Sequence, residues 1–235
     1  MEPSISSSST ILKPLMPFDK SLFPTLSIRN NKGDSENMSE IVPGATVVGV
    51  VYDSGVILGA DRRAAYGTFV IGKSVKKLFQ ITPRIGLASA GLISDVQTIV
   101  RQLNYHARMF KYNTSREITA RALSKLLSNI LFSNRLFPLI TQTLIGGFTF
   151  DTHGIYVLDA LGSVIEDKYA AAGSGTEIAL GILEAEYRDG MNMSEAKSLA
   201  LKAIRTALER DSASGNGIDL LIIDRAGTVE ESYPG

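Results

Sequence analysis

The sequence predicts an α+β fold in which two antiparallel sheets are stacked between two layers of helices, a four-layer αββα sandwich. Strand-like and helix-like segments follow each other in blocks: strands, two helices, strands, two helices, strands. Short turn sequences join neighbouring strand-like segments, which favours antiparallel pairing. Strands and helices do not alternate singly, so a parallel doubly wound sheet is disfavoured.

The first block of strands starts after Gly44. Residues 46–52 (TVVGVVY) and 56–60 (VILGA) are β-branched and apolar, and Asp-Ser-Gly between them is typical of a hairpin turn. Two further strands are predicted at residues 78–82 and 85–90, across a Pro-Arg turn. These four segments predict that the front of the domain is an antiparallel sheet.

Two adjacent helices are predicted next. Apolar residues recur at helical spacing in residues 94–110. Thr114 and Glu117 match a capping box ahead of a second helix that runs to about Phe137 and is stopped by Pro138. This second helix is apolar on much of its circumference, so we expect burial on more than one side and a partner subunit over it.

The second half of the chain repeats the order of the first. Strands are predicted at residues 143–150, 154–159 and near 164–170, helices at 177–188 and 194–210, and last strands at 219–223 and 228–232. Residues 1–44 differ in composition, with a serine cluster and several prolines, and predict a weakly structured leader ahead of one domain at 45–235.

Composition excludes several classes of function. The 24 basic and 24 acidic residues cancel, so the sequence gives no indication of binding to nucleic acid or to an anionic membrane surface. There is no cysteine, and the two histidines, His106 and His153, are isolated, so no metal site or other cofactor is predicted. No secretory signal or membrane-spanning run is found, which predicts a cytoplasmic protein.

One stretch carries a family resemblance. Residues 44–63 (GATVVGVVYDSGVILGADRR) resemble the start of the mature β subunits of the 20S proteasome, most similar to archaeal-type particles. The resemblance continues through KSVKKLF at 73–79, SAG at 89–91, GSG at 173–175 and DSASG at 211–215, and covers residues 44–235. It implies an N-terminal nucleophile hydrolase, a threonine endopeptidase whose nucleophile is freed by cleavage after a glycine.

The resemblance also implies roles for single residues. Asp61 and Lys77 correspond to the acid and the lysine that flank the nucleophile, where an ammonium lowers the pKa of the attacking hydroxyl. Gly91 corresponds to the backbone N–H that stabilises the oxyanion. The group that positions the free α-amino terminus corresponds to Ser174, Asp211 and Ser214. The pocket for the residue before the cut corresponds to Ala64, Val75, Phe79, Ser89 and Ile93, and its apolar character predicts a preference for hydrophobic residues.

The sequence departs from the family pattern at the nucleophile. The processing site is Gly44-Ala45, and Ala45 stands where the family has threonine. Thr46 is a poor substitute, because successive side chains of a strand point to opposite faces. Two explanations stay open: an introduced Thr→Ala change, which would leave the chain unprocessed and inactive, or a naturally non-catalytic structural β subunit. We favour the first, because a single break in an otherwise complete site is typical of a substitution.

The resemblance implies partners as well. They are proteasome α-ring subunits and other β subunits in stacked rings of seven (α7β7β7α7), a regulatory ATPase, and unfolded proteins as substrates. A proteasome α subunit is disfavoured, since α chains carry an extra N-terminal helix and lack a leader ending in glycine. An N-terminal nucleophile amidase acting on small molecules is a further alternative.

Overall fold

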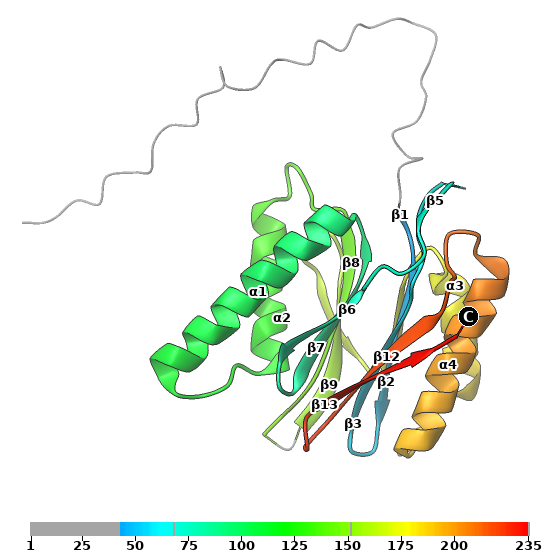
Figure 1. Cartoon of the computed structure of the whole chain (residues 1–235). Helices are drawn as coiled ribbons and strands as arrows, with labels where there is room; N and C mark the ends of the chain where they lie inside the picture. Colours follow the sequence, from blue (N-terminus) through cyan, green and yellow to red (C-terminus); the bar gives the residue numbers. More distant parts are fainter. Residues whose placement is uncertain (1–42, 68, 151, 235) are drawn as a thin grey trace, which may run out of the picture. The chain divides into compact units, whose positions relative to one another are not determined.

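A computed structural model describes residues 43–67, 69–150 and 152–234 of the chain. The predicted leader at 1–44 therefore lies outside the described residues, apart from its last two. Within the described part, two five-stranded sheets and one small three-stranded sheet are present, and every strand pair in them is antiparallel. Figure 1 shows the two large sheets facing each other with a pair of helices outside each.

The first large sheet, called the first sheet below, has the strand order β11-β2-β3-β12-β13. These strands are Tyr169–Gly173, Thr46–Tyr52, Gly55–Asp61, Ile218–Asp224 and Thr228–Tyr233. Helices α3 (Thr176–Glu186) and α4 (Met193–Arg210) cover its outer face, where α4 packs on β2 and β3 and α3 packs on β11.

The second large sheet, called the second sheet below, has the order β10-β9-β8-β7-β6. These strands are Val164–Asp167, Thr152–Leu158, Thr141–Thr149, Ile85–Gly91 and Leu78–Thr82. Helices α1 (Ile93–Thr114) and α2 (Ala120–Ser133) cover its outer face. The predicted four-layer αββα sandwich is confirmed, with the helices in the predicted pairs. The first four predicted strands do not form one sheet, however, because β2 and β3 belong to the first sheet and β6 and β7 belong to the second.

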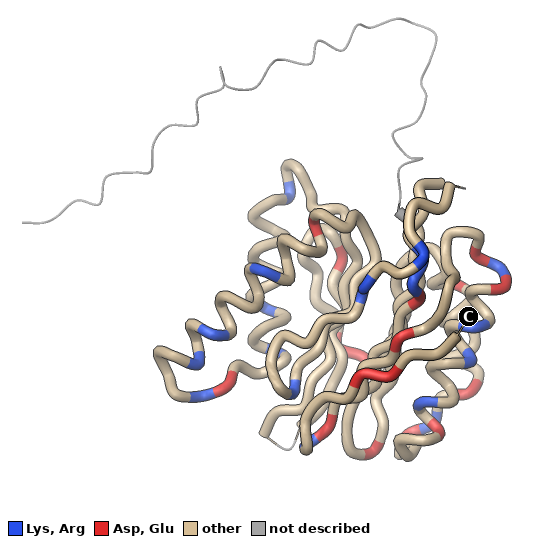
Figure 2. The backbone as a smooth tube through the Cα atoms, viewed as in Figure 1, with Lys and Arg blue, Asp and Glu red and all other residues tan. Residues whose placement is uncertain are grey.

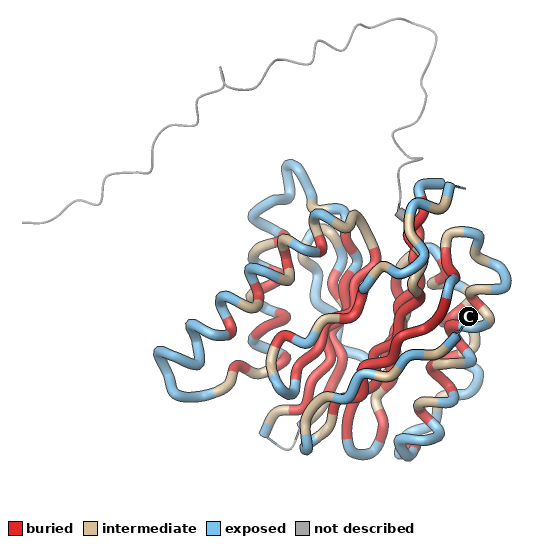
Figure 3. The backbone as a smooth tube through the Cα atoms, viewed as in Figure 1, coloured by how far each residue is buried: buried red, intermediate tan, exposed pale blue. Residues whose placement is uncertain are grey.

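Three apolar clusters hold the four layers together. One lies between α3, α4 and the first sheet, one between the two sheets, and one between the second sheet and α1, α2. Strands β3 and β12 are buried along nearly their whole length because both of their faces are covered. Figure 3 shows this burial concentrated in the strands, with exposure along the helices and loops.

The small sheet was not predicted. It consists of β1 (Pro43–Gly44), β4 (Ala64–Tyr66) and β5 (Phe69–Gly72), in the order β1-β4-β5. Gly44 pairs with Ala65, so the two residues before Ala45 form an edge strand. Strands of two to four residues are too short to show an alternating pattern in the sequence, which explains why they were missed.

Two predicted segments need correction. The predicted strand near 164–170 is two strands, because the chain crosses at Lys168 from β10 in the second sheet to β11 in the first. The predicted capping box at Thr114 is wrong: Thr114 is the last residue of α1, and its hydroxyl donates to the Phe110 carbonyl. Helix α2 instead begins after Thr119, whose side chain accepts from the Ala122 N–H at 3.1 Å.

Helix α2 also ends at Ser133, earlier than predicted, where Asn134 caps it by donating to the Ile130 carbonyl. It packs on β8, β9, β10 and α1, so it is buried on more than one side, while Ala122 and Phe132 are exposed. A partner subunit over that exposed side stays a prediction.

Charged residues are scattered over strands such as β13 as well as over helices and loops in Figure 2, and neither sign dominates the view. Of the helices in the described ranges, none combines the length and apolar character needed to cross a bilayer. No group of three or more potential metal-ligating side chains is found in the same ranges.

Candidate active site

Ala45 lies at the junction of β1 and β2. Its side chain is 2% exposed and belongs to the apolar cluster between the sheets. Gly44, Ala45 and Lys77 line the same cavity, of about 150 Å³. Ala45 therefore borders this cavity, as the resemblance implies for the nucleophile position.

Asp61 ends β3 and is paired with Lys77, which directly precedes β6. The carboxylate is buried and accepts hydrogen bonds from the Lys77 ammonium and from the backbone N–H groups of Thr46, Arg63 and Gly215, each of the last three at 2.9 Å. Burial lowers the pKa of Lys77 below its ordinary value, and the charge of Asp61 acts against that shift. The ion pair joins the two sheets beside Ala45, since Asp61 belongs to the first sheet and Lys77 leads into the second.

Ser174, Asp211 and Ser214 form a hydrogen-bonded chain that ends at the backbone of Ala45. The hydroxyls of Ser174 and Ser214 donate to the same Asp211 carboxylate oxygen at 2.5 and 2.6 Å. The N–H of Ala45 donates to the Ser174 hydroxyl oxygen at 3.1 Å. Of the three residues predicted to position an α-amino group, Ser174 thus contacts the backbone nitrogen of Ala45, and Asp211 and Ser214 are linked to it through Ser174.

Thr46 faces away from the cavity. Its hydroxyl is fully buried and lies 2.7 Å from that of Ser214. Because the single Ser214 proton is donated to Asp211, the Thr46 hydroxyl is the donor in this contact. Strand alternation predicts this orientation, so Thr46 offers no hydroxyl oxygen to a substrate in the cavity.

Close backbone approach explains two glycines of the site. A Cβ on Gly44 would lie 1.8 Å from the Ala213 Cβ, so a side chain there would collide with the loop after Asp211. Gly91 has φ +144°, and a Cβ there would lie 2.2 Å from the Ile140 carbonyl oxygen. Gly91 also lines the cavity, where its N–H was predicted to stabilise an oxyanion.

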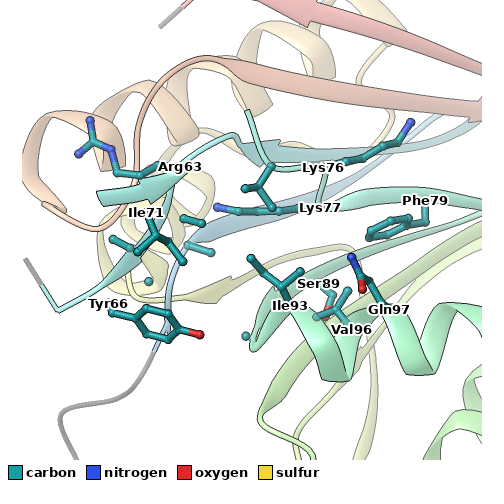
Figure 4. A pocket seen from close by; sticks show the side chains of 16 residues that line it. Arg63, Tyr66, Ile71, Lys76, Lys77, Phe79, Ser89, Ile93, Val96 and Gln97 are labelled. Atoms are coloured by element: carbon teal, nitrogen blue, oxygen red, sulfur yellow. The ribbon is translucent and has the colours of Figure 1, made fainter. Parts of the chain in front are cut away.

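All five residues predicted for the substrate pocket line the cavity: Ala64, Val75, Phe79, Ser89 and Ile93. Sequence reasoning missed Tyr66, Ile71, Val96 and Gln97. Figure 4 shows Tyr66 and Ile71 on one side of the cavity and Phe79 and Gln97 on the other, with the amino groups of Lys76 and Lys77 pointing in opposite directions. Tyr66 and Ile71 come from the small sheet, whereas the helical spacing of Val96 and Gln97 from Ile93 could have placed them beside it.

A four-layer sandwich of two antiparallel sheets between helix layers is typical of the N-terminal nucleophile class of hydrolase fold. A model of the proteasome subunit family matches residues 41–223. The chain is 44% identical over 189 residues to proteasome subunit beta 1 of Cenarchaeum symbiosum, covering 80% of this chain and 97% of that protein.

Two further relatives agree. Proteasome subunit beta 1 of Hyperthermus butylicus is 47% identical over 183 residues, which cover 77% of this chain and 90% of the relative. Proteasome subunit beta 2 of Thermofilum pendens is 42% identical over 195 residues, which cover 83% and 95%. The chain belongs to the family of 20S proteasome β subunits.

Proposed function

We propose that the chain is an unprocessed form of a proteasome threonine endopeptidase in which alanine has replaced the nucleophile. The observation that supports this proposal is the completeness of the surroundings of Ala45. The side chains that the resemblance implies for the site are present and hydrogen-bonded: Asp61, Lys77, Ser174, Asp211 and Ser214. Only a hydroxyl is missing at position 45.

With threonine at position 45, its hydroxyl oxygen would attack a peptide carbonyl while the hydroxyl proton moves to the α-amino group of the same residue. The Lys77 ammonium favours the alkoxide, and the Gly91 N–H stabilises the oxyanion that forms. The leaving amine takes the proton, an ester remains on the threonine oxygen, and water then hydrolyses the ester to release the acid and the free hydroxyl. No step uses a metal or another cofactor.

The same hydroxyl would cut the chain between residues 44 and 45. In the present chain Gly44 precedes Ala45, so the nitrogen that donates to Ser174 is a peptide amide. After the cut it would be an α-amino group held by the same serine. We infer that a leader of residues 1–44 is retained here, ahead of a catalytic domain at 45–235.

The assembly follows from the family. We propose that the chain assembles with α and β subunits into stacked rings of seven in the order α7β7β7α7. A regulatory ATPase would deliver unfolded proteins, and the particle would be cytoplasmic. The cavity wall of Ala64, Val75, Phe79 and Ile93 favours a hydrophobic side chain before the cut.

The experiment compares Ala45→Thr with Ala45→Val in the assembled particle. Valine has the shape of threonine without the hydroxyl, so it controls for packing. We expect the threonine variant alone to lose residues 1–44, seen by intact mass, and to hydrolyse a fluorogenic peptide. Full assembly with neither event would contradict the proposal.

A non-catalytic ring subunit is the second candidate. Its supporting observation is the burial of the Ala45 methyl in the apolar cluster between the sheets, where it needs no hydroxyl to pack. The same comparison separates the two functions. A structural subunit with threonine at position 45 would assemble but would neither lose its leader nor hydrolyse the peptide.

A further inference from the structure

The candidate nucleophile position and the candidate oxyanion donor belong to different sheets. Ala45 leads into β2 of the first sheet, whereas Gly91 ends β7 of the second sheet. Their relative position therefore depends on contacts that join the sheets at this end of the sandwich. Catalysis is sensitive to that position, since a misplacement of about 1 Å can cost a hundredfold in rate.

The Lys77–Asp61 ion pair provides one such contact, and the side chain of Gln142 provides another. Gln142 lies in β8, opposite Ala90 and one residue pair from Gly91. Its side-chain oxygen accepts a hydrogen bond from the Gly173 N–H at 2.8 Å. Gly173 ends β11, so this bond also crosses from the second sheet to the first.

Gly173 is in close contact with the backbone of Ala45. It has φ +99°, and a Cβ on it would lie 2.1 Å from the Ala45 carbonyl oxygen. Gly173 is followed directly by Ser174, which accepts from the Ala45 N–H. A shift of Gly173 would therefore move both the backbone at position 45 and the serine that holds its nitrogen.

Buried hydroxyls fix the strand that carries Gln142. On either side of it, Thr141 and Thr143 lie 2.7 and 3.0 Å from the Ser89 hydroxyl, and 3.0 Å from each other. These three side chains are buried, whereas Gln142 itself is exposed. The exposed amide thus extends from a rigid base, and Gly91, Gln142, Gly173 and Ser174 line one cavity of about 300 Å³.

We propose that Gln142 is a positioning residue, which holds Gly173 and through it the residue at position 45 at the correct distance from Gly91. The inference rests on the function proposed above, because it concerns the chemistry at position 45. Among the described residues, no hydrogen bond joins Gln142 to the Lys77 ammonium. We therefore expect Gln142 to affect the position of residue 45 and not the charge around it.

The test uses Gln142→Met and Gln142→Glu in the assembled Ala45→Thr particle. Methionine keeps the length of the side chain but has no comparable acceptor, and glutamate keeps an acceptor oxygen. We expect methionine to lower kcat and the rate of leader removal about tenfold with KM within twofold, and glutamate to restore most of the rate. Gln102→Met, at an exposed position of α1, is the matched control and should leave both rates unchanged.

A second measurement does not need activity. In the chain with Ala45, amide hydrogen exchange of a peptide spanning residues 170–176 should be several-fold faster with Gln142→Met and unchanged with Gln142→Glu. Normal kinetics with methionine, or equal losses with methionine and glutamate, would overturn the proposal. If the assembled Ala45→Thr particle neither loses its leader nor hydrolyses the peptide, the proposed function fails. The positioning role is tested separately, because hydrogen exchange unchanged by Gln142→Met would overturn it.

Discussion

At the scale of single residues, Asp61 combines two tasks in one carboxylate. It is paired with Lys77, and it also accepts from the three backbone N–H groups of Thr46, Arg63 and Gly215. These amides belong to three different segments, so the carboxylate joins the start of β2, the end of β3 and the loop before β12. Removing the Asp61 carboxylate should therefore affect the fold as well as the proposed chemistry.

We therefore expect Asp61→Ala to destabilise the chain more than Lys77→Met. The first change leaves a buried ammonium and three N–H groups unpaired, at a cost of about 3–5 kcal/mol. The second leaves a carboxylate that still accepts three hydrogen bonds. Urea unfolding of the two variants measures the difference, and equal losses would contradict this account of Asp61.

The lowered pKa of Lys77 predicts how the free energy of unfolding depends on pH. Burial holds it below the ordinary value of 10.5, so between the two pKa values the unfolded chain binds more protons than the folded chain. The free energy of unfolding should then rise with pH across that window in the parent chain, relative to Lys77→Met. Paired urea titrations at several alkaline pH values measure this, and a difference that falls with pH would show that the ion pair outweighs burial.

Gly44, at the proposed processing site, offers a test of close packing. Gly44→Ala places a Cβ 1.8 Å from the Ala213 Cβ, so we expect a loss of about 1–3 kcal/mol through overpacking. Adding Ala213→Gly removes that atom and should recover most of the loss. Ala213→Gly alone is the control, and Gly44→Ala with parental stability would show that the loop moves aside freely.

At the scale of elements, the helix start that the sequence pattern predicts for α2, at Thr114, differs from the N-cap hydrogen bond that forms in the structure, at Thr119. Thr119→Ala removes the observed N-cap and should cost about 1 kcal/mol. The Thr114 hydroxyl donates back to the Phe110 carbonyl within α1 and accepts a longer hydrogen bond, of 3.3 Å, from the Arg116 N–H beyond the helix, so we expect a smaller effect from Thr114→Ala. Thermal unfolding of both variants decides the order, and a larger loss from Thr114→Ala would restore the original prediction.

Most elements could be predicted because each is long enough to contain several repeats of its hydrophobic pattern. Strands such as β2 and β3 and the helix α4 lie within one or two residues of their predicted ranges. The start of α2 could not be fixed in the same way, since Thr114 with Glu117 and Thr119 both match the residue preferences of a helix start. In the structure α1 continues to Thr114, and no residue near Thr114 in the sequence indicates that the helix extends that far.

The candidate site was predicted through motifs and not through periodicity. The residues predicted around the nucleophile position do lie around Ala45, although their roles remain proposals. Tyr66 and Ile71 were missed along with the small sheet that carries them. Gln142 was missed because an exposed glutamine in a strand has the pattern of any solvent-facing residue, and its contact with Gly173 spans 31 residues.

At the scale of the whole molecule, the three apolar clusters account for the interior but leave large side chains outside it. Tyr112, Leu136 and Phe137 are each more than 80% exposed in the isolated chain. Such side chains near the ends of α1 and α2 agree with a subunit that is incomplete by itself. The family assigns the chain to a larger particle, and the exposed residues agree with that assignment.

The thickness of the sandwich depends on glycines where the two sheets approach. A Cβ on Gly86 of β7 would lie 2.4 Å from Leu221 Cδ2 and 2.9 Å from Ile223 Cδ1, both on β12 of the other sheet. Gly181, inside α3 and exposed, has no atom within 4 Å of the equivalent position. The same glycine-to-alanine change should therefore have opposite effects at the two positions.

We expect Gly86→Ala to destabilise the chain by about 1–3 kcal/mol, because Leu221 and Ile223 are packed between the sheets and cannot move without strain. Gly181→Ala should stabilise it by about 0.5–1 kcal/mol, since alanine restricts the unfolded chain and favours helix. Urea unfolding of both variants beside the parent tests the pair. Stabilisation by Gly86→Ala would mean that the two sheets are not in close contact at β7 and β12.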